Sequence, residues 1–112
     1  MNQMMIVLFG VIKMIEYIKE YGVTNLDFEY ISHNVKPDII ELIGLSEVTV
    51  RENLAYYNSI GIASDIAKII VARPDLILND KETIIKTISK IDMNLFRNVV
   101  NKSIEDLIIL GV

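Results

Sequence analysis

The side chains best able to bond to another molecule are concentrated in one short segment, "SEVTVRENLAYY", at residues 46–57. Serine, threonine, arginine and asparagine side chains hydrogen-bond to base edges in DNA grooves, and glutamate accepts a bond from cytosine. We expect a helix here, and its polar side chains are candidates for such contacts. The predicted nucleic-acid contacts of this segment are Ser46, Glu47, Thr49, Arg51, Asn53 and Tyr56.

Two lysines further along the chain, Lys86 and Lys90, are a second candidate contact with nucleic acid. A spacing of four residues places them on one face of a predicted helix, where they could contact successive phosphates. An ordinary solvated helix face has the same pattern. Five basic residues lie in the surrounding region, namely Lys81, Lys86, Lys90, Arg97 and Lys102.

Residue types typical of catalysis are present without the patterns that catalysis requires. His33 is the only histidine and lies one turn after Glu29, whereas a stable metal site usually needs three or four protein ligands. No cysteine occurs, which excludes disulfides, thiolate zinc sites and cysteine nucleophiles. We expect no enzyme, no cofactor and no metal site.

The composition indicates one acidic and apolar domain over residues 1–112. Apolar residues make up 52% of the chain and the mean hydropathy is +0.40, so some apolar surface is expected to be covered by another copy or a partner. The net charge of −4 argues against phosphate binding. Without cysteines or an export signal, the chain is expected to be intracellular and cytoplasmic.

An apolar run at residues 4–12 begins the first predicted helix, which extends from Met4 to Tyr21 and ends at Gly22. Its first two turns are apolar on every side, which predicts a place in the core or a homodimer interface. The run is too short to cross a membrane. The predicted interface residues are Ile6, Leu8, Phe9 and Ile12.

The remaining helices are predicted from capping residues and apolar periodicity. No segment alternates as a strand does, so the fold is predicted to be all-α, a compact bundle of about eight short helices. The predicted helix starts are Thr24 or Asn25, Pro37, Ser46, Ser64, Asn79, Asp92 and Ser103, and the predicted stops are Gly22, Gly44, Gly61 and Pro74.

The segment "PDIIELIGLSEVTVRENLAYY", residues 37–57, resembles the bacterial helix-turn-helix domains. In this comparison Gly44 would adopt the positive φ of a tight turn, and apolar residues such as Val50 and Leu54 would fix the angle between the two helices. The resemblance implies that the second helix enters a groove of double-stranded DNA. It also implies that the exposed first turns of this helix contact the bases through Ser46, Glu47, Thr49, Arg51 and Asn53.

A weak internal sequence similarity relates "KPDIIEL" at residues 36–42 to "RPDLIL" at residues 73–78. The separation of the two segments is within the range of helical repeat periods. Residues 51–110, with their "IASDIAKIIVARPDLIL" run, resemble the repeats of the mitochondrial transcription termination factor family. That resemblance implies a curved helical array that binds nucleic acid.

Two functions therefore remain open. The first is a dimeric, helix-turn-helix DNA-binding protein that regulates transcription. The second is an acidic all-helical module that binds another protein and no nucleic acid. A stripe that joins Arg51, Lys86, Lys90 and Arg97 in space would favour the first, whereas scattered cations would favour the second.

Overall fold

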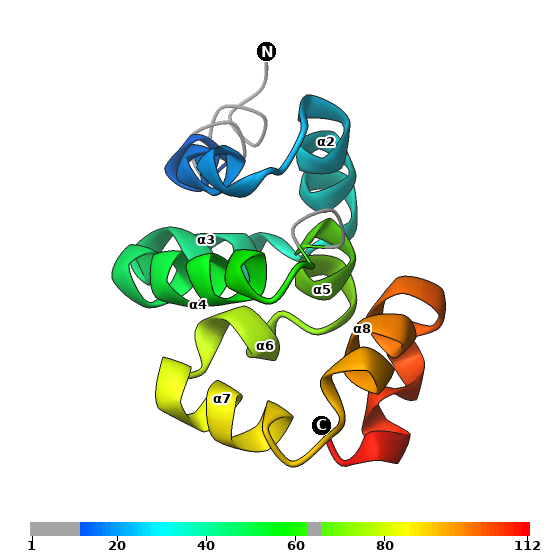
Figure 1. The fold of residues 1–112 in the computed structure, drawn as a ribbon. Helices are drawn as coiled ribbons and strands as arrows, with labels where there is room; N and C mark the ends of the chain where they lie inside the picture. The colour runs from blue at the N-terminus through cyan, green and yellow to red at the C-terminus, as the bar shows by residue number, and fades with distance from the viewer. Residues whose placement is uncertain (1–11, 63–65) are drawn as a thin grey trace.

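A computed structural model describes residues 12–62 and 66–112 of the chain, and these residues contain helices and no strand. The predicted all-α fold is confirmed. In chain order the elements are the 3₁₀ helix η1 (Glu16–Tyr21), α2 (Asn25–Asn34), α3 (Pro37–Leu45), α4 (Glu47–Ser59), α5 (Ile66–Ala72), α6 (Asp75–Leu78), α7 (Lys81–Ile88), α8 (Met93–Lys102) and the 3₁₀ helix η3 (Ile104–Leu110) (Figure 1).

Local capping residues define several helix ends. Thr24 accepts a hydrogen bond from the Asp27 backbone while the Asp27 side chain accepts one from the Thr24 backbone, which forms a capping box at the start of α2. Asp92 caps α8 as predicted. The start of α7 is capped by Asp80, not by Asn79, because the Asp80 carboxylate accepts the Thr83 N–H.

The N-terminal helix differs from the prediction. Its first part lies outside the described residues, and the helical turn at residues 12–14 ends at Ile15, after which η1 is a 3₁₀ helix. The Ile15 and Ile18 N–H groups each donate to the carbonyl three residues earlier. Side chains three residues apart then lie above one another, which places Ile15 and Ile18 together in the core.

The prediction for Gly44 was also wrong. This glycine lies inside α3 and is not among the glycines with positive φ. A Cβ atom at this position would lie 2.8 Å from the Cβ of Met14, so glycine is needed for the close approach of these two backbones. Ser46 occupies the N-cap position of α4, but its side chain makes no capping hydrogen bond.

The elements form three stacked units of three segments each. The units are η1–α2–α3, α4–α5–α6 and α7–α8–η3. The first helices form one row, in which α4 packs against η1 on one side and α7 on the other, and α5 packs against α2 in the neighbouring row. Figure 1 shows these rows on the left and right of the molecule, which measures 48 × 26 × 22 Å.

In each of the first two units, a buried tyrosine joins the first segment to the third. The Tyr17 hydroxyl donates to the Ile43 carbonyl at 2.7 Å and so joins η1 to α3. The Tyr57 hydroxyl donates to the Leu76 carbonyl at 2.6 Å and joins α4 to α6. Each bond satisfies a polar group in the core and ties the first helix of a unit to its third.

Candidate functional site

Helix α4, the predicted DNA-reading helix, is the central helix of the fold. It packs against η1, α3, α6 and α7. Val50, Leu54 and Tyr57 are fully buried, as expected for the side of a helix that faces the core. The outward side carries Val48, Glu52 and further exposed residues but no cation. This surface lacks the positive charge that contact with phosphates requires.

Asn53 does not face solvent, so its predicted contact with a base was wrong. Its side chain is 0% exposed. The Nδ2 atom donates to the carbonyls of Ile77 at 2.8 Å and Asn79 at 2.7 Å. Asn53 therefore satisfies two carbonyl groups at the end of α6 and holds that helix against α4.

Arg51 is occupied by contacts within the chain. Its Nε donates to Glu47 at 2.9 Å, and its Nη1 donates to Glu20 and, at 3.3 Å, to the Tyr21 hydroxyl. The guanidinium carbon also lies 5.1 Å from the centre of the Tyr17 ring. The hydrogen bond from Arg51 lowers the pKa of Glu20 below its ordinary value. These contacts neutralise Arg51 and the predicted contact Glu47 together.

The remaining predicted contacts on α4 are only partly accessible. Ser46, Thr49 and Tyr56 are half-buried. The ring of Tyr56 lies 5.8 Å from that of Tyr57, and burial raises the pKa of the Tyr56 hydroxyl. Tyr56 is therefore less exposed than predicted.

The four cations that would form a stripe differ in their surroundings. Lys86 and Lys90 are exposed, but α7 ends at Ile88, so Lys90 lies beyond the helix that the two were expected to share. Arg97 donates to the Ile60 carbonyl at 3.2 Å and to Asn94 at 2.7 Å. With Arg51 also paired, the two arginines of the stripe serve the fold.

Of the predicted interface residues, Ile6, Leu8 and Phe9 lie outside the described residues, and Ile12 is half-buried against the core. Within the residues that the structure describes, no helix is long and apolar enough to cross a membrane. Nor do three or more histidine or carboxylate side chains in these ranges gather as a metal site would require.

A different face of the molecule is hollowed. Three adjoining hollows of about 370, 330 and 330 Å³ share lining residues on α5. The central one shares Val71 with one neighbour and Ala72 and Glu105 with the other. We call the three hollows together the α5 groove, which is bordered by α2 and the α2–α3 link on one side and by α8 and η3 on the other.

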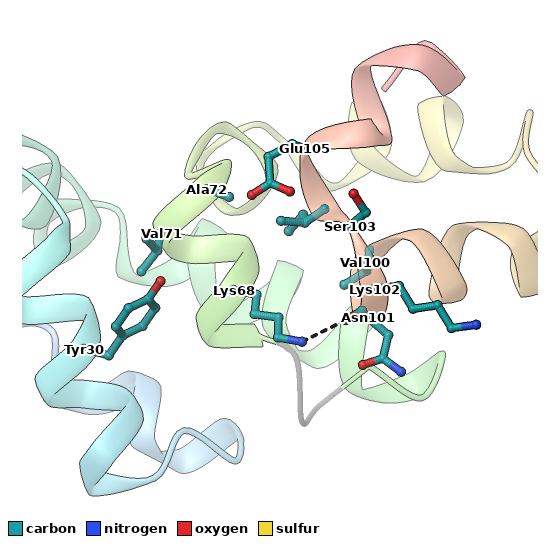
Figure 2. Close-up of a pocket in the computed structure, with 10 residues that line it drawn as sticks. Tyr30, Lys68, Val71, Ala72, Val100, Asn101, Lys102, Ser103 and Glu105 are labelled. Carbon is teal, nitrogen blue, oxygen red and sulfur yellow. Dashed lines mark hydrogen bonds between the residues drawn. The ribbon is translucent and has the colours of Figure 1, made fainter.

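The central hollow combines an apolar floor with a polar rim, and its residues come from all three units (Figure 2). Tyr30 comes from α2, Lys68 from α5, and Asn101 from the end of α8. The Lys68 ammonium donates to the Asn101 carbonyl at 2.9 Å and joins α5 to α8. The floor consists of Val71, Ala72, Val100 and Ile104. Such a lining suits a ligand with both apolar and polar groups.

Sequence reasoning missed the α5 groove because no contiguous motif encodes it. Tyr30 and Lys102 were visible only as one tyrosine and one basic residue among several, and Lys68 belonged to no motif. Their common position follows from the stacking of α2, α5 and α8, which local sequence does not specify. The one available signal was a cation at the junction before the third segment of each unit, namely Lys36, Arg73 and Lys102.

Comparisons with protein-family models, with curated proteins and with solved structures find no match for this chain.

Proposed function

We propose that this chain is a non-catalytic helical-repeat module that binds another protein, of which one segment lies along the α5 groove. The single observation that carries this proposal is the central hollow, whose lining comes from all three units. Stacked helical units commonly present an extended concave surface for binding. The apolar floor supplies buried area, and the polar rim supplies orientation.

Double-stranded DNA is the weaker candidate. Binding of duplex DNA depends mainly on exposed cations that neutralise phosphates, whereas Arg51 and Arg97 are held by partners within the chain and Arg73 is paired with Asp75 at 3.0 Å. Asn53, the residue best suited to read adenine, is enclosed. A role in transcription would therefore have to come through a protein partner.

Site-specific photo-cross-linking in the native host tests the proposal. A benzophenone amino acid replaces Tyr30 on the groove rim, and the matched control replaces Glu52 on the outward side of α4. We expect one protein adduct from position 30 and none from position 52. The protein is identified by mass spectrometry, and its affinity for the purified chain is then measured by titration.

Two results would contradict the proposal. One is equal cross-linking at positions 30 and 52, including no cross-linking at either position. The groove would then have no special role in binding. The other is binding of random duplex DNA that falls steeply between about 50 and 200 mM salt, since that dependence reports phosphate contacts. The second result would restore the DNA-binding hypothesis.

A further inference from the structure

Two of the four cations that line the α5 groove are engaged by the fold. Arg73 donates to both carboxylate oxygens of Asp75 at 3.0 Å and to the Val112 carbonyl at 3.0 Å. Lys68 donates to the Asn101 carbonyl at 2.9 Å. Because both side chains already have partners within the chain, neither of them selects the charge of a ligand.

The remaining charges of the lining balance. Lys36 and Asp38 line the hollow beside the α2–α3 link, and Lys102 and Glu105 line the central hollow. Each of these cations is matched by one acid in the same hollow. A ligand segment with a net charge of either sign would leave part of that charge without a counterpart over the apolar floor, which costs free energy. The lining therefore favours a segment without net charge.

The third hollow, which we call the η3 hollow, is lined mainly by apolar side chains. Three of its five lining residues are Ala72, Ile108 and Val112, and one of the other two is the paired Arg73. Ile108 is 75% exposed, and the adjacent Ile109 is 78% exposed. Large apolar side chains that stay exposed beside an apolar hollow are typical of a surface that another chain covers.

The opposite wall of the groove presents apolar groups as well. Tyr30 of α2 lines the central hollow and is 49% exposed, and Leu26, one helical turn earlier, is 78% exposed. Figure 2 shows Tyr30 on the side of the hollow opposite to α8. The groove therefore offers apolar contacts on its α2 side and on its η3 side.

We propose that the segment of the partner protein in the α5 groove is apolar and carries no net charge. One of its large apolar side chains fills the η3 hollow against Ala72 and Ile108, and another lies on the floor of the central hollow beside Tyr30. The two hollows share Ala72 and Glu105, so both side chains belong to one short segment. This inference rests on the proposed function, and it adds the chemistry of the partner.

Selection from a phage-displayed library of random twelve-residue peptides against the full chain tests this chemistry. We expect the enriched peptides to contain at least two large apolar residues and to have a mean net charge near zero. The affinity of an enriched peptide should change less than about threefold between about 50 and 500 mM salt, because salt screens interactions between charges and not apolar contacts.

Variants of the η3 hollow locate the binding site of that peptide. Ile108→Asp should lower the affinity at least about tenfold, because a carboxylate would enter the hollow. Ala72→Trp should lower it as well, since the added ring fills the same hollow without adding charge. Val48→Asp is the matched control, because Val48 is 73% exposed on α4 and lines none of the three hollows. The control should change the affinity less than about twofold.

Several results would overturn the inference. These are enrichment of strongly acidic or strongly basic peptides, no enrichment, and equal effects of Ile108→Asp and Val48→Asp. A dimer of the natural chain that Ile108→Asp dissociates, as measured by light scattering, would identify a second copy as the occupant and would also overturn it. If the selection fails but cross-linking from position 30 captures one protein, the proposed function stands and only the apolar, uncharged chemistry is wrong.

Discussion

Replacement of Asn53 by alanine separates a structural role from a role in DNA reading. The change removes donors from the buried Ile77 carbonyl and from the part-buried Asn79 carbonyl. A buried polar group that loses its partner costs about 1 to 3 kcal/mol, and the part-buried carbonyl costs less because water can reach it. The better helix propensity of alanine returns roughly half a kcal/mol. We expect a net loss of about 1 to 4 kcal/mol in the free energy of unfolding.

Urea unfolding followed by circular dichroism measures this loss. With a slope of about 2 kcal/mol per molar urea, the midpoint should fall by roughly 0.5 to 2 M. Asn58→Ala is the matched control, since Asn58 is exposed on the same helix and gains the same helix propensity. The control should change stability by less than about 0.5 kcal/mol. Equal midpoints for the two variants would refute the structural role of Asn53.

The variant Asn53→Asp tests the burial of this side chain through the pH dependence of stability. An ionised carboxylate would face two carbonyl oxygens in the core, so burial should raise the pKa of the introduced group above its ordinary value. A group with a raised folded-state pKa contributes its stability at low pH and loses it as the pH rises through that value. The variant should therefore be closer to the natural protein in stability at pH 4 than at pH 7. A difference that is constant with pH would contradict this assignment.

Three further predictions concern other parts of the chain. Gly44→Ala should lower the free energy of unfolding by about 1 to 3 kcal/mol, because the new Cβ would clash with Met14; an unchanged urea midpoint would contradict the close approach. The hydrogen bonds from Thr83 lower the pKa of Asp80, so its contribution is present above the ordinary carboxyl pKa and is lost as the pH falls through the lowered value; Asp80→Ala should reduce the melting temperature at pH 7 and much less at the acid end of the titration. If the N-terminal segment is a homodimer interface, Leu8→Asp should yield soluble monomer by light scattering, and an unaltered mass would exclude that role.

The parts of the fold that were predicted correctly depend on interactions between near neighbours. Gly22 and Gly61 end their helices with φ values of 95° and 84°, and Thr24 and Asp92 accept backbone N–H groups three residues later. The conformation of each glycine and the hydrogen bonds of each cap depend only on residues close in sequence. Residue type and spacing are therefore enough to predict these helix ends.

The positions of Arg51 and Asn53 were not predicted correctly because they depend on distant residues. Arg51 is held by Glu20 and Tyr21, which precede it by about thirty residues, and Asn53 bonds to carbonyls 24 and 26 residues later. Helix α4 therefore lies at the centre of the fold although its sequence has the polar pattern of a surface helix. Residue types that can contact DNA bases also serve to join helices, and the sequence pattern alone does not distinguish these uses.

The third unit shows why the repeat was only partly visible. The similarity between residues 36–42 and 73–78 depends on a proline after each cation, whereas Ser103 follows Lys102. The unit nevertheless keeps two helices and a short third segment, because packing depends on buried apolar positions such as Ile88 and Phe96 more than on particular motifs. The cation at the junction persists although the proline does not. Lys102 lies in the last turn of α8, where a cation is favoured by the helix dipole, so the end of this helix explains the cation without a repeat motif.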